Sequence, residues 1–249
     1  MMIEQTISKL KSMKLSGMVN AYQEQAGLSD VFAMSFDERF GLITDREEIE
    51  RENKKFQSRL KKAKMREQAC IESLDFNTTR GIDKSQILSL RSNEWIKRFQ
   101  NILITGPTGV GKTYLGCALL HEACRNGYSA RCVRLPRLLE EIAIAKADGS
   151  FSRVMDTLAK TQVLLLDDWG ISVFNEEQRR LILEIVEDRY GLRSTIITSQ
   201  IPVDQWFDII GDATLADAIM DRIVNGAYKL TLKGASMRRV KPSLTEKKD

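Results

Sequence analysis

The feature that most constrains this chain is a glycine-rich run that follows a short apolar segment. Residues 106–113 read Gly-Pro-Thr-Gly-Val-Gly-Lys-Thr, and the apolar segment before them ends at Thr105. Glycines let a backbone wrap around phosphate groups with its N–H groups inward, and the start of a helix adds partial positive charge. The run therefore predicts a phosphate-binding loop of the Walker A type, between a buried strand and a helix that begins near Gly111.

Two side chains in this run carry the chemistry expected of an ATP site. Lys112 is expected to reach the β- and γ-phosphates, and Thr113 is expected to offer its hydroxyl to Mg²⁺. The predicted cofactors are therefore ATP and Mg²⁺. The residues expected to contact the nucleotide are Gly106, Pro107, Thr108, Gly109, Val110, Gly111, Lys112, Thr113 and Tyr114.

A second apolar run, residues 163–166, ends in two adjacent acids. Asp167 is expected to act on the Mg²⁺ shell through water, while Asp168 would polarise the attacking water in ATP hydrolysis. Glutamate is more usual at the second position, and aspartate is shorter by one methylene. The sequence therefore also leaves open an ATP-gated binding module with negligible turnover.

Polar residues end another buried run, residues 195–200, which reads Thr-Ile-Ile-Thr-Ser-Gln. Because strand tips in a parallel sheet face the ligand, a polar residue at this tip could hold the lytic water or sense the γ-phosphate. A simple strand-end turn is the alternative. Arg222 lies later, in a helical pattern, where an exposed arginine could stabilise charge in a neighbour's ATP site. A local ion pair with a nearby aspartate is the alternative for Arg222.

The order of apolar runs predicts the fold. Strands separated by helices imply a parallel sheet covered on both faces. Residues before 75 instead show apolar positions at near-helical spacing, which predicts about three helices. We therefore predict an all-helical N-terminal domain (1–75), an α/β domain (76–240) and a flexible tail (241–249). The five expected strands are residues 101–105, 130–135, 163–166, 195–198 and 228–232.

Charge is distributed unevenly along the chain. The net charge is +4, and residues 53–66 hold seven lysines and arginines without an acid. Such clusters attract a phosphate backbone, although a solvated helix face is an equally good interpretation. The candidate DNA contacts in this cluster are Lys54, Lys55, Arg59, Lys61 and Lys62.

Several classes of protein are disfavoured. No run approaches the roughly 18 apolar residues of a membrane helix, and the first residues do not resemble a signal peptide, so a cytoplasmic protein without a membrane partner is expected. The four cysteines form no Cys-x-x-Cys pair and His121 is the only histidine, which argues against a zinc site and histidine-dependent catalysis. A small-molecule P-loop kinase would need an arginine-rich lid that the chain does not clearly offer. For Trp95, Trp169 and Trp206, core packing is favoured over base stacking.

Taken together, these motifs resemble the IstB family. Its members are ATP-binding helper proteins encoded by insertion sequences, related to the DnaC helicase loaders and, more distantly, to the DnaA initiators. The likeness covers nearly the whole chain. The segments that carry it are residues 9–18, 101–113, 166–170, 198–200, 211–222 and 233–238.

The resemblance implies an AAA+ fold with the parallel sheet order 5-1-4-3-2, self-assembly, binding to double-stranded DNA and help to a cognate transposase. ATP turnover is expected to be slow and stimulated by assembly. By position, Arg222 would be an arginine finger, and Ser199 or Gln200 would be the polar residue that holds the lytic water or senses the γ-phosphate. Arg238 is a candidate second sensor. The helices after the second strand carry DNA contacts in the related initiators, which adds Arg137, Lys146 and Arg153 as candidates. A replicative helicase loader of the DnaC type, whose N-terminal helices would grip a helicase, is the alternative.

Overall fold

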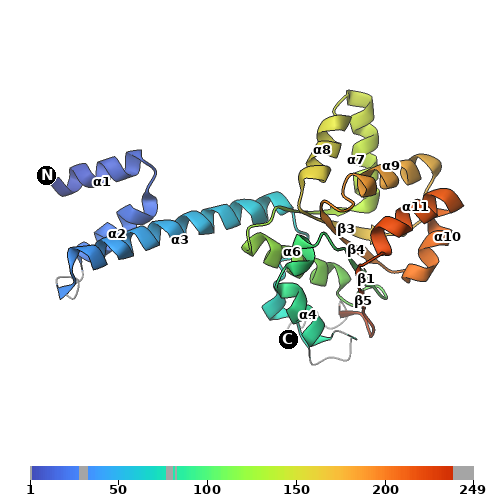
Figure 1. The fold of residues 1–249 in the computed structure, drawn as a ribbon, viewed down its shortest axis with the longest axis horizontal. Coiled ribbons are helices and arrows are strands. Elements are labelled where there is room, and N and C mark those ends of the chain that lie inside the picture. The colour runs from blue at the N-terminus through green and yellow to red at the C-terminus, as the bar shows by residue number, and fades with distance from the viewer. Residues whose placement is uncertain (1, 28–32, 77–80, 82, 238–249) are drawn as a thin grey trace, which may run out of the picture. The chain divides into compact units, whose positions relative to one another are not determined.

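The computed structural model describes residues 2–27, 33–76, 81 and 83–237. By its contacts the chain divides into two compact units, Met1–Ser58 and Arg59–Asp249. Figure 1 shows the helices and strands of each. The domain boundary expected at residue 75 stays a prediction, and the expected tail, together with Arg238, lies outside the described residues.

The first unit is helical, as predicted. The helices in its described part are α1 (Met2–Ser12), α2 (Ser16–Ala26) and α3 (Phe36–Ala63), which continues past residue 58. A buried carboxylate joins two of them, because Glu47 of α3 accepts hydrogen bonds from the backbone N–H groups of Gly17 and Met18, at 2.7 and 3.1 Å. These donors lie in the first turn of α2 and have no intrahelical partner, so Glu47 caps that helix. The ion pair with Arg51 and these bonds hold the pKa of Glu47 below its ordinary value.

The second unit is built on a five-stranded sheet. Its strands are β1 (Ile102–Thr105), β2 (Ala130–Arg134), β3 (Val163–Trp169), β4 (Ser194–Ser199) and β5 (Tyr228–Thr231). The order is β2-β3-β4-β1-β5 and every neighbouring pair is parallel. This is the predicted order 5-1-4-3-2 read from the other edge, so the predicted fold is confirmed. The strand β3 continues past its expected end and includes both acids.

Helices cover both faces of this sheet (Figure 1). The helices that begin in the described part of this unit are α4 (Lys84–Arg91), α5 (Glu94–Lys97), α6 (Lys112–Arg125), α7 (Leu135–Asp148), α8 (Phe151–Lys160), α9 (Glu176–Glu187), α10 (Trp206–Ile210) and α11 (Ala213–Val224). On one face α6 lies so close that a Cβ on Gly116 would come within 3.0 Å of Leu165. The opposite face, which carries Leu164 and Leu166, packs against α7, α8, α9 and α11 in one buried apolar cluster. The sheet therefore holds the loops at its carboxyl edge on a rigid support.

All three tryptophans belong to the core, as predicted. Trp95 and Trp169 are each 1% exposed and Trp206 is 0% exposed. The rings of Trp169 and Trp206 lie 5.1 Å apart, under the end of β3. Within the described residues, no helix has the length and apolar character needed to span a membrane.

Candidate nucleotide site

The glycine-rich run forms the turn between the carboxyl end of β1 and the start of α6. Its backbone requires glycine at Gly106 and Gly109, where φ is +146° and +83°. A Cβ on Gly106 would collide with the carbonyl oxygen of Leu232. A Cβ on Gly109 would collide with the hydroxyl of Ser236. The chain after β5 thus presses against the loop, and only glycine lets the loop keep this conformation.

Lys112 is the first residue of α6, and its ammonium folds back into the loop. Its Nζ donates to the carbonyl oxygens of Gly106 and Pro107, each at 2.7 Å, and the residue is only 9% exposed. A nearly buried ammonium that is already held in place loses little freedom when it binds a phosphate. Because α6 is 14 residues long, its N-terminus adds partial positive charge at the same point. The loop therefore presents a preorganised site for an anion.

Asp167 is the centre of the polar cluster at this edge, and it is fully buried. Its Oδ1 accepts hydrogen bonds from the hydroxyls of Thr113, at 2.8 Å, and Thr198, at 2.6 Å. Its Oδ2 accepts from Nη1 of Arg66, at 2.6 Å. The structure brings Thr113 and Asp167, the two residues predicted to act on Mg²⁺, into direct contact. Sequence reasoning missed Thr198 and Arg66 as partners, because no spacing links them to Asp167.

An irregularity in β3 sets the direction in which the side chain of Asp168 points. Side chains of a regular strand alternate between the two faces, but the pairing of β3 with β4 shifts register at the two acids, and Asp168 has a φ of +65°. Such a backbone costs about 1–3 kcal/mol in a residue other than glycine and is concentrated at functional sites. As a result Arg66 lies 2.6 Å from Asp167 and 3.8 Å from Asp168. The second carboxylate also accepts from Nε of Arg134, at 2.7 Å.

The donor set at this edge fits Mg²⁺. The ion prefers oxygen ligands, and a hydroxyl and a carboxylate, those of Thr113 and Asp167, meet here. The guanidinium of Arg66 shows that the carboxylate accepts a cationic partner. Thr113 and Asp167 are therefore the residues of this chain that would hold the ion beside the phosphates.

The polar residues at the end of β4 have different surroundings. Ser199 is fully buried, and its hydroxyl donates to the carbonyl oxygen of Trp169 at 2.9 Å. Gln200 is exposed, and its Oε1 accepts from the hydroxyl of Thr108 in the phosphate loop, at 2.7 Å. Of these two residues, Gln200 contacts the phosphate loop, whereas the Ser199 hydroxyl is bonded to the backbone at the end of β3.

A cavity of about 230 Å³ opens beside the loop. It is lined by Leu74 and Asp75 from the segment before α4, by Val110 and Tyr114, and by Met237. Apolar walls next to a phosphate loop suit a purine base, since flat apolar rings gain from burial. Sequence reasoning included Val110 and Tyr114 but missed Leu74 and Met237, because those two reach the loop only through the folding of distant segments.

Arg222 lies at the opposite, amino edge of the sheet, near the end of α11. The four residues of β1 alone separate the two edges by about 13 Å. Its Nη2 pairs with Glu187 of α9 at 3.0 Å, and its Nη1 donates to the carbonyl oxygen of Ala218 at 2.8 Å. The ring of Tyr190 lies 6.0 Å from the guanidinium. The alternative from the sequence was a local ion pair with Asp217 or Asp221, but the acid that pairs with Arg222 is Glu187, which belongs to another helix.

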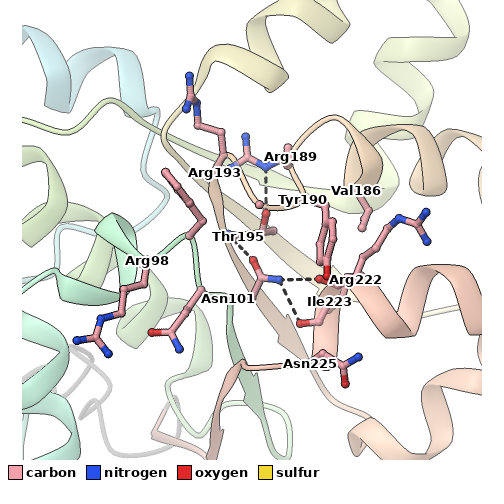
Figure 2. A pocket seen from close by; sticks show the side chains of 13 residues that line it. Arg98, Asn101, Val186, Arg189, Tyr190, Arg193, Thr195, Arg222, Ile223 and Asn225 are labelled. Atoms are coloured by element: carbon pink, nitrogen blue, oxygen red, sulfur yellow. Dashed lines mark hydrogen bonds between the residues drawn. The ribbon is translucent and has the colours of Figure 1, made fainter.

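An asparagine clamp fixes the end of α11 (Figure 2). Asn101 Nδ2 donates to the carbonyl oxygens of Arg222 and Ile223, at 3.2 and 3.1 Å. Its Oδ1 accepts from the backbone N–H of Thr195 at 2.9 Å, and Thr195 Oγ1 accepts from buried Arg189 at 3.0 Å. Burial lowers the pKa of the Arg189 guanidinium to about 9. Because the last carbonyls of a helix lack intrahelical partners, Asn101 both satisfies them and ties the helix end to β4.

Several of the basic residues predicted to contact DNA already bond to other groups of the chain. Lys54 and Lys55 pair with acids one turn away on α3, at 2.8 and 2.7 Å. Arg59 donates to a backbone carbonyl of α6 at 2.7 Å, and Lys146 pairs with an acid of α9 at 3.1 Å. The candidates that are exposed and form no ion pair within the described part of the chain are Lys61, Lys62, Arg137 and Arg153.

Solved structures share the fold over most of the chain. A DnaI structure aligns with a TM-score of 0.59 at 23% identity, over 71% of this chain and 93% of that one. The DnaC helicase loader aligns with a TM-score of 0.52 at 25% identity, over 60% of this chain and 87% of that one. DnaA from Aquifex aeolicus gives a TM-score of 0.56 at 18% identity, over 70% and 53%. The architecture is therefore that of AAA+ P-loop proteins.

Relatives in sequence extend over nearly the whole chain. An insertion sequence ATP-binding protein of Sinorhizobium fredii is 45% identical over 239 residues, which are 96% of this chain and 98% of that one. The ATP-binding protein of insertion sequence IS1162 from Pseudomonas fluorescens is 49% identical over 203 residues, 81% and 88% of the two chains. A family model described as IstB-like ATP binding protein matches residues 8–245. The chain belongs to this family of insertion sequence ATP-binding proteins.

Proposed function

We propose that this chain is an ATPase that assembles on target DNA and assists the transposase of an insertion sequence. The observation that supports ATPase activity is the convergence of Thr113 and Thr198 on one oxygen of Asp167; the insertion sequence relatives support the link to transposition. Mg²⁺ held by Thr113 and Asp167 would neutralise charge on the phosphates. Lys112 would bind the β- and γ-phosphates, and Asp168 would orient and polarise the attacking water.

Hydrolysis is proposed to need a second copy of the chain. Arg222 lies at the sheet edge opposite its own phosphate loop, beyond the reach of one side chain. Its guanidinium would therefore serve the site of a neighbouring subunit, where such an arginine contributes about 10³–10⁵ in rate. Turnover is thus expected to be slow in the isolated chain and to rise with assembly.

The proposed partners are double-stranded DNA and a transposase encoded by the same insertion sequence. The names of the relatives tie them to insertion sequences. Exposed basic residues such as Arg137 and Arg153 supply the phosphate contacts, and assembly would multiply contacts that are individually weak. A protein acting on this DNA would work in the cytoplasm.

The test is binding to a plain DNA duplex with size analysis, under ATP, ADP and no nucleotide. Wild type is compared with Arg222→Ala and with Arg180→Ala, an exposed arginine of α9 that pairs with Glu176 one turn away. ATP is expected to drive wild type and Arg180→Ala into large assemblies on the duplex, whereas Arg222→Ala binds ATP but loses turnover or assembly. A wild-type protein that stays monomeric and ignores the duplex in every state would contradict the proposal.

A replicative helicase loader is the second candidate, because the DnaC helicase loader shares the fold at 25% identity. The same ATPase residues would serve either role. The insertion sequence relatives, which match both ends of the chain, favour the first candidate. Affinity for the purified transposase, compared with affinity for the replicative helicase of the same host, separates the two.

A further inference from the structure

A second cleft lies along β2, the outermost strand of the sheet, beside Asp167 and Asp168. Its volume is about 240 Å³, and the charged residues that line it are Lys64, Arg66, Arg131, Arg134, Arg137 and Glu141. They come from three segments: the one after α3, the strand β2 and the helix α7. The fold thus brings five cations and one acid to a single cavity, here named the basic cleft.

Only part of this positive charge is compensated. Arg131 pairs with Glu141 of the cleft at 3.2 Å. Arg66 pairs with Asp167 at 2.6 Å and Arg134 pairs with Asp168 at 2.7 Å, both acids lying outside the cleft lining. Lys64 and Arg137 are exposed, and neither side chain has an ion pair or hydrogen bond within the part of the chain that the structure describes. Because cations at short range repel one another, an open cavity with this lining is stabilised by an anion.

We propose that the basic cleft binds phosphates of a DNA backbone, and that Mg²⁺ with ATP strengthens this binding by releasing Arg66 from Asp167. The inference rests on the proposed function, because it takes DNA and ATP as ligands of this chain. Phosphate fits the lining, since a guanidinium donates two parallel hydrogen bonds to its oxygens. The side chains of Arg66 and Arg134 are 45% and 44% exposed, so a large ligand can reach them.

The coupling follows from a shared carboxylate. Asp167 is the acid proposed to hold Mg²⁺, and it is also the partner of Arg66. Two cations at one carboxylate repel, so Mg²⁺ weakens the hold of Asp167 on Arg66. The released guanidinium already lines the basic cleft and adds a cation to it. By linkage, DNA that binds Arg66 raises the affinity for Mg²⁺ with nucleotide by the same factor.

The first test measures binding of a labelled duplex of about one helical turn, roughly 10 bp. This short length limits how many subunits can share one DNA molecule. Duplex affinity is measured between about 50 and 200 mM salt, where each lost phosphate contact makes the negative slope of log affinity against log salt less steep by about 0.9. For Lys64→Gln and for Arg137→Gln, the salt slope is expected to flatten by this amount with or without Mg²⁺ and a non-hydrolysable ATP analogue. For Arg66→Gln, the slope is expected to flatten only when Mg²⁺ and the analogue are present. Arg180→Gln is the matched control, whose slope should equal that of wild type.

A second measurement does not depend on DNA or on turnover. Mn²⁺ replaces Mg²⁺ as a spectroscopic probe, and its affinity for the protein with bound ADP is read by electron paramagnetic resonance. Arg66→Gln is expected to tighten Mn²⁺ binding about fivefold or more, because a competing cation is gone. A misfolded variant would lose Mn²⁺ binding instead, so the two effects have opposite signs.

Several outcomes would overturn the inference. Unchanged duplex affinity in Lys64→Gln and Arg137→Gln removes the cleft as the DNA site, while equal losses for Arg66→Gln in both nucleotide states, or unchanged Mn²⁺ affinity, remove the coupling. Inorganic pyrophosphate that displaces the duplex at equal phosphate concentration would make a free polyphosphate the ligand. A wild-type protein that binds no duplex in any state contradicts the proposed function itself, and the DNA assignment then fails with it.

Discussion

The two edges of the sheet both gather arginines, but they hold them differently. At the carboxyl edge, Arg66 is bound by Asp167, whose side chain is 0% exposed. At the amino edge, Arg222 is bound by Glu187, whose side chain is 50% exposed. Water screens an exposed pair and leaves it worth little, whereas a buried carboxylate needs its cation. A buried acid therefore holds the arginine at the carboxyl edge until another cation replaces it, whereas the arginine at the amino edge can turn to a partner at little cost.

The largest expected effect on turnover comes from a substitution at the amino edge. Arg222→Ala is expected to lower ATP turnover of the assembled protein by about 10³-fold or more, because a guanidinium that stabilises the transferring phosphoryl group is lost. Steady-state phosphate release checks it. Affinity of a fluorescent nucleotide for the dilute single chain should stay unchanged, and a large loss of that affinity would show that Arg222 serves its own site.

The next largest effect on turnover is expected from a substitution at the carboxyl edge. Asp168→Asn is expected to lower turnover by about 10²–10⁴-fold while ATP still binds, since the carboxylate that polarises water becomes a neutral amide. Equal mixtures of Asp168→Asn and Arg222→Ala sharpen the comparison. Some interfaces in the mixture would join an intact acid to an intact arginine, so turnover should partly return. A mixture as inactive as its components would contradict the assignment of the two edges to different subunits.

A smaller effect is expected from the clamp at the amino edge. Asn101→Ala leaves the end of α11 untied, and misplacing a catalytic group costs about 10²-fold or less in rate. It also leaves helix-end carbonyls without a partner, at about 1–3 kcal/mol of unfolding free energy. Asn225→Ala is the matched control, because Asn225 donates to Asp221 on the surface. Equal turnover in the two variants, with folding checked by thermal melting, would remove the positioning role of Asn101.

The smallest effect concerns the two polar residues that end β4. Gln200→Ala removes one hydrogen bond to Thr108, worth about 0.5–1.5 kcal/mol, so turnover or ATP affinity should fall by about 2- to 10-fold. Ser199→Ala instead leaves a buried carbonyl without its donor, and its main effect should be a lower melting temperature. The opposite pattern would make Ser199 the residue that senses the phosphates.

Sequence reasoning located the strands of the second unit to within a few residues, because strands buried on both faces are continuous apolar runs. It also placed the phosphate loop and the two acids of β3. It missed the bulge that gives Asp168 a φ of +65°, since no residue type announces that backbone at an aspartate. It treated Arg66 as part of a charged run, whereas the fold sets it against Asp167.

The sequence by itself determined the elements, the phosphate loop and the identity of the acids, because each depends on consecutive residues and their burial pattern. Only the tertiary structure decided which cation meets which acid. Arg66 and Asp167 are 101 positions apart, and Asn101 and Arg222 are 121 positions apart. Such contacts follow from sheet order and helix packing, which bring distant segments to one edge. The site is therefore encoded locally, while its electrostatic balance is set by the fold.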